Sequence, residues 1–272
     1  MKQRIITGTV LTILAAGLIY LGDVYFAVAA IIVLCMALYE VYGALETAQH
    51  RPVAWPTWLA ITVSVPLGML FGHKVVVPIL MAASMLIIAV VIFRQEPKLE
   101  DALMSLLPLY AVVLPGLGIL AVTQVQPKSV QWLLLVMLLF VPTAGDTAAY
   151  FIGSSFGKRK FCPAVSPNKT VAGAVAGLVG SVATAAICRG VAAILVTSPT
   201  TVLPTWTFCI AVGLIGGVAG QIGDLFASLI KRHCGIKDFS SLFPGHGGMM
   251  DRLDSILFMS VVLYCCRLMF FS

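Results

Sequence analysis

Charged side chains are scarce in this sequence. Asp, Glu, Lys and Arg together make up 10% of the 272 residues, whereas 60% are hydrophobic and the mean hydropathy is +1.03. A water-soluble domain cannot bury that much apolar surface, so a soluble fold is excluded. Two familiar patterns are also missing, the G-x-x-x-x-G-K-[ST] phosphate loop and the C-x-x-C pair. The seven Cys are odd in number and lie mostly in apolar runs, so neither a disulfide framework nor a zinc site is indicated.

Long apolar runs dominate the chain instead. A helix needs about 20 apolar residues to cross a bilayer. Nine runs of about that length are present, at 4–22, 25–45, 53–72, 74–94, 102–124, 131–152, 172–199, 203–227 and 253–271. They are continuous and lack the alternation of barrel strands, so we predict an all-α, polytopic transmembrane bundle of about nine spans. We expect the first run to be an uncleaved helix rather than a signal peptide.

The chain is expected to divide into two regions. Residues 1–130 would hold N-terminal transmembrane helices, about five spans. Residues 131–272 would form a catalytic transmembrane region whose motifs lie in cytoplasmic loops, because the chemically unusual residues collect there.

Basic residues are divided unevenly between the two ends of the spans. With nine spans, the N-terminus and the loops after spans two, four, six and eight share one side. Of the 17 Lys and Arg residues, thirteen lie on that side, Arg189 lies within a span, and three lie on the other side: Lys74, Lys128 and Arg267. The positive-inside rule makes the richer side cytoplasmic. The +6 net charge thus belongs to membrane loops, where anionic lipids and nucleotide phosphates are better partners than nucleic acid.

Carboxylates collect at the same face of the later spans. Asp146 and Asp224 lie near the cytoplasmic ends of two spans, and Asp251 and Asp254 open the last one with an i, i+3 spacing. A carboxylate within hydrocarbon costs roughly 2.5–3.5 kcal/mol on insertion scales, so each needs a partner. A salt bridge or a helix-packing hydrogen bond would explain any one of them. Four together favour a hard cation, Mg²⁺ or Mn²⁺, with up to two cations in the site.

Two loops rich in cations and glycine flank these carboxylates. One contains Ser166–Thr170, SPNKT, and the other is SLIKRHCGIKDFSSLFPGHGGMMDRLD at 228–254, with four cations, three carboxylates and two His. Gly247 and Gly248 would let backbone amides approach an anion, and the helix that follows favours phosphate at its N-terminus. His246 lacks a second His at ligand spacing, so we interpret it as a phosphate contact or a structural residue. The pattern indicates metal-assisted phosphoryl or nucleotidyl transfer.

Residues 228–254 resemble the signature of the phosphatidate cytidylyltransferases, or CDP-diacylglycerol synthases. That signature reads S-x-[apolar]-K-R, four residues, K-D, then P-x-H-G-G-x-x-D-R-x-D. The matching residues are Ser228, Lys231, Arg232, Lys237, Asp238, Pro244, His246, Gly247, Gly248, Asp251, Arg252 and Asp254. AGDTAAYFIGSSFGK and SPNKT also look like upstream motifs of the family. One departure is Ala172, which stands where the family usually has an acidic residue after Lys-Thr.

The resemblance implies an enzyme that transfers CMP from CTP to phosphatidic acid, giving CDP-diacylglycerol and pyrophosphate for phospholipid biosynthesis. It also implies an integral protein of a bacterial inner membrane, a homodimer, with its active site facing the cytoplasm. Catalytic roles fall to Asp224, Asp251, Lys237 and Arg252. Substrate binding falls to Ser166, Lys169, Ser228, Lys231, Arg232, His246, Gly247 and Gly248. Metal binding falls to Asp146, Asp224, Asp251 and Asp254.

Three other functions compete with this one. A CTP-dependent lipid kinase would pass the γ-phosphate to a polyprenol-type alcohol. A cation-coupled transporter would use Asp146 and Asp224 within the membrane. A non-catalytic lipid-binding scaffold would not need four Asp. Two further charged residues stand apart: Glu40 is expected to form an interfacial salt bridge, and Arg189 has no evident partner in the sequence.

Overall fold

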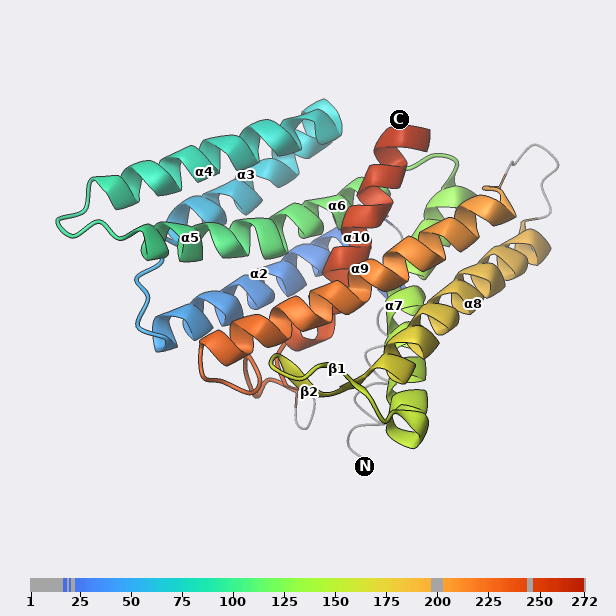
Figure 1. Cartoon of the computed structure of the whole chain (residues 1–272). Coiled ribbons are helices and arrows are strands. Elements are labelled where there is room, and N and C mark those ends of the chain that lie inside the picture. Colours follow the sequence, from blue (N-terminus) through green and yellow to red (C-terminus); the bar gives the residue numbers. More distant parts are fainter. Residues whose placement is uncertain (1–16, 19, 21–22, 197–202, 244–246, 272) are drawn as a thin grey trace.

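The computed structural model describes residues 17–18, 20, 23–196, 203–243 and 247–271, and most of them are helical (Figure 1). The helices are α2 (Asp23–Thr47), α3 (Trp55–Phe71), η1 (Gly72–Val75), α4 (Val76–Ile92), α5 (Leu99–Pro108), η2 (Leu109–Val113), α6 (Leu114–Val122), α7 (Lys128–Phe156), α8 (Val171–Leu195), α9 (Trp206–His233) and α10 (Met250–Phe270). Strands β1 (Lys160–Cys162) and β2 (Ser166–Thr170) form an antiparallel hairpin. The predicted all-α membrane fold is confirmed, apart from this hairpin.

The number of spans differs from the prediction. Six helices are long and apolar enough to cross a membrane: Val24–Thr47, Leu99–Val122, Lys128–Phe156, Val171–Leu195, Trp206–His233 and Met250–Phe270. With the shorter apolar helix α4, the described residues hold about seven candidate spans, not nine. Of the other two predicted spans, 4–22 lies almost wholly outside the described residues. The run at 53–72 forms α3, which ends where Gly72 takes a φ of 72° and is not among the candidate spans.

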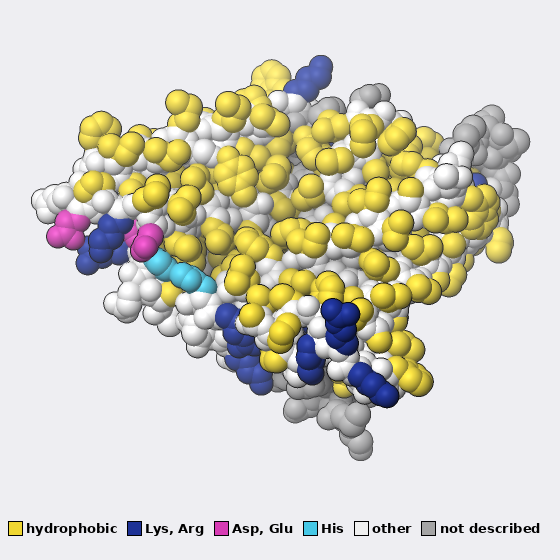
Figure 2. All heavy atoms as spheres, viewed as in Figure 1, with side chains coloured by type: hydrophobic (Ala, Val, Ile, Leu, Met, Phe, Trp, Pro, Cys, Tyr) yellow, Lys and Arg dark blue, Asp and Glu magenta, His cyan; other side chains and the backbone are white. Residues whose placement is uncertain are grey.

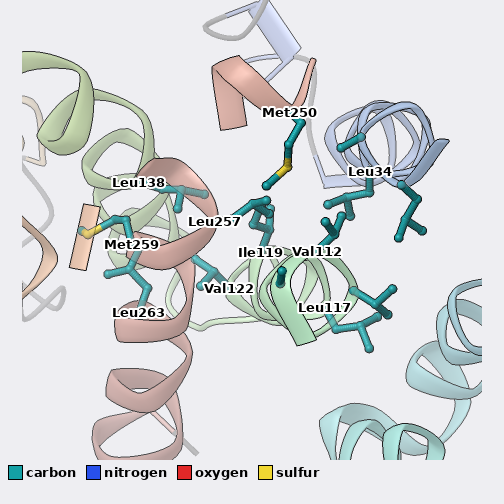
Figure 3. Close-up of a cluster of buried hydrophobic side chains, with 14 of the residues drawn as sticks. Leu34, Val112, Leu117, Ile119, Val122, Leu138, Met250, Leu257, Met259 and Leu263 are labelled. Carbon is teal, nitrogen blue, oxygen red and sulfur yellow. The ribbon is translucent and has the colours of Figure 1, made fainter. Parts of the chain in front are cut away.

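Helix α10 lies at the centre of the bundle, in contact with α2, α6, α7 and α9. Figure 3 shows the apolar cluster where these helices meet, with Ile119 and Leu257 lying between Leu138 and Leu34 in this view. All four side chains are buried. This cluster fixes the position of α10, which carries two of the predicted site residues at its start.

Helices α7, α8 and α9 pack closely through small residues. The buried face of α8 repeats every four residues, at Gly173, Gly177, Ser181 and Ala185. A Cβ added to Gly217 of α9 would come within 2.7 Å of the Ser181 Cβ. Small residues at four-residue spacing let membrane helices approach until their backbones nearly touch. The faces of α7 and α9 that carry Asp are thereby held close to each other.

The four loops that were predicted to share one side meet at one end of the bundle. Between the loops after α2 and α4, Arg94 Nη1 donates to the Arg51 carbonyl at 2.7 Å. The rings of His50 and His233 stack at 5.1 Å between centroids and join the loop after α2 to the end of α9. The neighbouring Arg232 donates to a carbonyl of the β1–β2 hairpin. Figure 2 shows apolar side chains over most of the visible face, with Lys and Arg gathered along one edge.

Candidate active site

Three carboxylates from three helices lie within electrostatic reach of one another. Asp146 is on α7, Asp224 on α9 and Asp254 on α10, and the negative charge of Asp224 acts on both of the others. Lys169 forms an ion pair with Asp224, and Ser255 Oγ donates to Asp146 Oδ2 at 3.1 Å. We call Asp146, Asp224 and Asp254 the aspartate trio. The three carboxyl groups of the trio thus have one ammonium, that of Lys169, paired among them.

The β1–β2 hairpin places Lys169 beside the trio. β2 ends at Thr170, whose Oγ1 accepts a hydrogen bond from Gly173 N at 3.2 Å and so caps α8. The same Oγ1 lies 3.5 Å from the Gly153 carbonyl of α7. Lys169 is therefore fixed by a hairpin on one side and a helix start on the other. Ser166 begins the same strand, and Ala172 lies in the first turn of α8.

Asp251 has different hydrogen-bond partners from the residues of the trio. Its side chain is only 5% exposed, and Oδ1 accepts from Lys231 Nζ at 2.6 Å. Oδ2 accepts from the backbone amides of Phe239 at 3.0 Å and Gly248 at 2.9 Å. A buried charge is stable only when it is paired and hydrogen-bonded, and here all three donors come from the protein. Asp251 therefore ties the α9–α10 loop to the first turn of α10 and to α9.

The amides predicted to hold a substrate phosphate are bound to carboxylates of the protein instead. Gly248 N donates to Asp251, while Met249 N and Met250 N donate to Glu40 at 2.9 and 2.8 Å. The N-terminus of α10 thus faces two carboxylates of the protein, and phosphate binding by Gly247 and Gly248 stays a prediction. The sequence could not show this, because one acceptor lies about 200 residues earlier. The glycines do allow the close approach that was predicted, with Gly247 at a φ of 78°.

The other predicted residues differ in exposure. Ser228 is half-buried on α9, and Lys237 lies exposed on the α9–α10 loop. Arg232 and Arg252 are also exposed, and the charge of Arg252 acts on the α7 carboxylate. His246 lies outside the described residues. Lys169 and Arg252 thus lie near the trio, where phosphate groups would find both charge and hydrogen-bond donors.

Glu40 is the residue that the sequence prediction missed. An interfacial salt bridge was expected, but its described hydrogen-bond partners are neutral: the Ser240 hydroxyl, at 2.6 Å, and the amides of Met249 and Met250. The signal was present, since a lone acid in an apolar run marks a functional site by default. Arg189, by contrast, lies in α8 away from the trio. Its Nε donates to a carbonyl of the α8–α9 connection, and its guanidinium lies over the ring of Trp206.

The trio fits a hard divalent cation in charge and in donor type. Its donors are carboxylate oxygens without thiolates, as Mg²⁺ and Mn²⁺ prefer. Within the described parts of the chain, however, no three Asp, Glu, His or Cys side chains form a group that could hold a metal ion. The predicted set of four ligands divides into the trio and Asp251, whose oxygens already accept from Lys231 and two amides.

Fold and site together define a helical membrane protein that gathers carboxylates and cations at one end. The profile described as the cytidylyltransferase family matches residues 2–270. The chain therefore belongs to the cytidylyltransferase family, which confirms the family and the enzyme class predicted from 228–254.

Three curated relatives are similar to this chain. The phosphatidate cytidylyltransferase of Helicobacter pylori is 32% identical over 269 residues, which cover 97% of this chain and 90% of that protein. The phosphatidate cytidylyltransferase of Bacillus subtilis is 42% identical over 119 residues, 44% of this chain and 41% of that protein. The uncharacterized protein YnbB of Escherichia coli is 41% identical over 139 residues, 49% of this chain and 44% of that protein. The matched segment thus spans less than half of the last two relatives.

Proposed function

We propose that this protein transfers CMP from CTP to phosphatidic acid, forming CDP-diacylglycerol and pyrophosphate. The observation that carries the proposal is the aspartate trio, which lies beside Lys169 at one end of an apolar bundle. The names of the relatives support it, above all that of the H. pylori enzyme, which matches along 97% of the chain. A bilayer protein with such a site is suited to joining a charged nucleotide to a lipid.

The reaction is an in-line displacement at the α-phosphorus of CTP. A phosphate oxygen of phosphatidic acid forms the new P–O bond, and the bond from the α-phosphorus to the bridging oxygen breaks, so pyrophosphate leaves with that oxygen. The attacking phosphate is already anionic, so no side chain has to remove a proton. Positioning and charge stabilisation therefore supply most of the catalysis.

Different residues would bind the metal ion and the phosphate groups. Asp146, Asp224 and Asp254 would hold Mg²⁺ or Mn²⁺, which when bound offsets charge on the phosphates. Lys169, at the edge of the trio, and the exposed cations Arg232, Lys237 and Arg252 bind phosphate groups of the two substrates. Lys231 acts indirectly, by holding Asp251, because its ammonium is paired with that carboxylate.

Labelled CTP separates this function from its rivals. The detergent-purified protein is incubated with Mg²⁺, phosphatidic acid and CTP that carries radioactive phosphorus at either the α or the γ position. Cytidylyl transfer moves the α label into lipid and the γ label into pyrophosphate. A lipid kinase would move the γ label into a polyprenol-type acceptor, and a transporter or scaffold would move neither. Lipid labelled from the γ position, or no labelled lipid, would refute the proposal.

The site faces the cytoplasm of a bacterial inner membrane. Support comes from the thirteen-to-three division of basic residues and from the meeting of the four loops at one end. A Cys placed at the exposed Ser241, in a variant without the exposed Cys265, should resist an impermeant thiol reagent in intact cells and react after permeabilisation. Labelling of intact cells from outside would refute the orientation.

The active form is a homodimer, as the family resemblance implies. Crosslinking in native membranes, before detergent is added, should yield a species of twice the monomer mass. A monomer at every crosslinker concentration would refute this part of the proposal.

A further inference from the structure

Glu40 joins the N-terminal part of the chain to the signature loop. Its Oε1 accepts from Ser240 Oγ at 2.6 Å and from Met249 N at 2.9 Å, and its Oε2 accepts from Met250 N at 2.8 Å. Glu40 is only 8% exposed. Both carboxylate oxygens are therefore engaged, and every one of these donors lies at least 200 residues later in the chain.

These contacts supply the N-terminal cap that α10 lacks in its adjacent sequence. The residue before the helix is Met249, which has a helical backbone conformation and makes no side-chain capping hydrogen bond. The first amides of a helix have no acceptor within the helix, and a negative charge there is stabilising. The cap that Ser, Thr or Asp normally provides from the adjacent sequence is here provided by α2.

The adjacent glycine is explained by the same carboxylate. A Cβ built on Gly248 would lie 2.7 Å from the Glu40 Cδ, closer than real Cβ atoms come to other atoms. The preceding Gly247 meets the other carboxylate in the same way, since its Cβ would lie 2.6 Å from Asp251 Oδ2. The loop thus passes between two carboxylates, and each glycine leaves room for one of them.

We propose that Glu40 is a positioning residue of the active site, which fixes the first turn of α10 and with it Asp251 and Asp254. It does not touch the reacting atoms. Glu40 sets where the first turn of α10 begins. Asp254 lies one helical turn after the amides that Glu40 holds. The effect on catalysis rests on the proposed function, whereas the effect on the loop does not.

Hydrogen exchange tests the contact without any assay of activity. In the Glu40→Gln variant only one acceptor oxygen remains and the charge is lost. Exchange of the Met249 and Met250 amides, measured by mass spectrometry on the detergent-purified protein, should accelerate about tenfold or more, which is the factor expected for one charge-assisted hydrogen bond. Glu46→Gln, an exposed Glu of the same helix, should leave this exchange unchanged. Unchanged exchange in Glu40→Gln would overturn the proposal.

Turnover tests the positioning role. For folded, monodisperse Glu40→Gln, kcat should fall about tenfold or more, while KM for CTP changes less, because the phosphate-binding cations are intact. A kcat within twofold of the wild type, despite faster exchange, would reduce Glu40 to a structural residue and overturn the proposal. If the wild type itself makes no CDP-diacylglycerol, the proposed function fails and the exchange result still decides whether the contact exists.

A second variant tests the fit between Glu40 and the glycine. When Glu40 is present, Gly248→Ala should accelerate exchange of the Met249 and Met250 amides, because the new methyl group displaces the Glu40 carboxylate. In the Glu40→Ala background the space is vacant, so adding Gly248→Ala should cause no further acceleration. Additive effects of the two substitutions would show that they act separately and would overturn the proposal.

Discussion

Helices α2 to α6 form a first group and helices α7 to α10 a second, and the contacts among α7, α8 and α9 in the second group differ from those of the first. In the first group the largest fully buried side chains are branched and bulky, such as Leu34, Leu38 and Ile87. In the second group, α7, α8 and α9 meet through glycine and serine, as at Gly217 and Ser181. Bulky side chains keep helix axes apart and tolerate rearrangement, whereas small residues hold the backbones at one short distance. The trio lies in the closely packed group, where the separation of the helices is best defined.

Two carboxylates, Asp101 of the first group and Asp224 of the second, have different surroundings. Asp101, at the start of α5, is 5% exposed and has an arginine nearby: Arg94 Nη1 lies 3.4 Å from its Oδ2, and Arg51 N donates to its Oδ1. Asp224 instead has one lysine and lies near two further carboxylates. Asp101 thus has an arginine of its own, whereas the three carboxyl groups of the trio have one lysine paired among them. We expect the first arrangement to stabilise the fold and the second to serve the chemistry.

Removal of divalent cations should have the largest effect. With excess chelator, formation of CDP-diacylglycerol should fall to background, and added Mg²⁺ or Mn²⁺ should restore it, because the trio then loses the charge that offsets it. The elution profile of the protein should not change, since apolar and small side chains hold the helices of both groups together. Full activity in excess chelator would rule out a divalent cation.

The next largest effect is expected from Asp224→Asn. If Asp224 binds the proposed cation, the loss of its negative charge should lower turnover by about 100-fold or more, since each factor of ten corresponds to about 1.4 kcal/mol. Asp254→Asn should behave in the same way, and Asp251→Asn should lower turnover through the loop that it anchors. Near-native turnover of a well-folded Asp224→Asn would make that residue structural, like Asp101.

Two alanine substitutions compare the packing of the two groups. Gly217→Ala should destabilise the protein by about 1–3 kcal/mol, because the methyl group overlaps with Ser181. Gly43→Ala, on α2 with nothing within 4 Å of a new Cβ, should be neutral or stabilise by about 0.5–1 kcal/mol. Thermal unfolding in one detergent ranks them, and Ser181→Gly should rescue Gly217→Ala. Equal stability of the two variants would show that close packing is not needed there.

The smallest effect is expected from Asp101→Asn. Losing the charge should cost about 1 kcal/mol of stability, the scale of a single hydrogen bond, because the amide can still accept from Arg51. Turnover per folded molecule should stay within about twofold of the wild type. A loss comparable with that of Asp224→Asn would mean that the loops of the first group take part in catalysis.

The sequence predicted those features that depend on spacing along one segment. Apolar runs predicted the helices, although the count of spans is about seven rather than nine. Four loops that were predicted to share one side do meet at one end of the bundle. Asp251 and Asp254 were recognised from a motif within one loop and one helix. The difference in their partners was not predicted. The amides that donate to Asp251 reach it only because the loop folds back.

The missed features depend on contacts between distant segments. Glu40 has three donors from residues 240–250, and nothing near position 40 in the chain indicates them. The β1–β2 hairpin also went unpredicted. Its strands are three and five residues long and contain two Lys, so they lack the apolar alternation by which strands are recognised.

The pairing of Glu40 with Met250 has a consequence for biosynthesis. The two residues are 210 positions apart in the chain. Ribosomes therefore synthesise α2 to α9, and the membrane takes them up, before the Met250 amide can meet the Glu40 carboxylate. Contacts of such long range form late and slowly in folding. The cytidylyltransferase site is thus assembled only when α10 inserts among helices already in place. A chain halted before that point would occupy the membrane without the means to consume CTP.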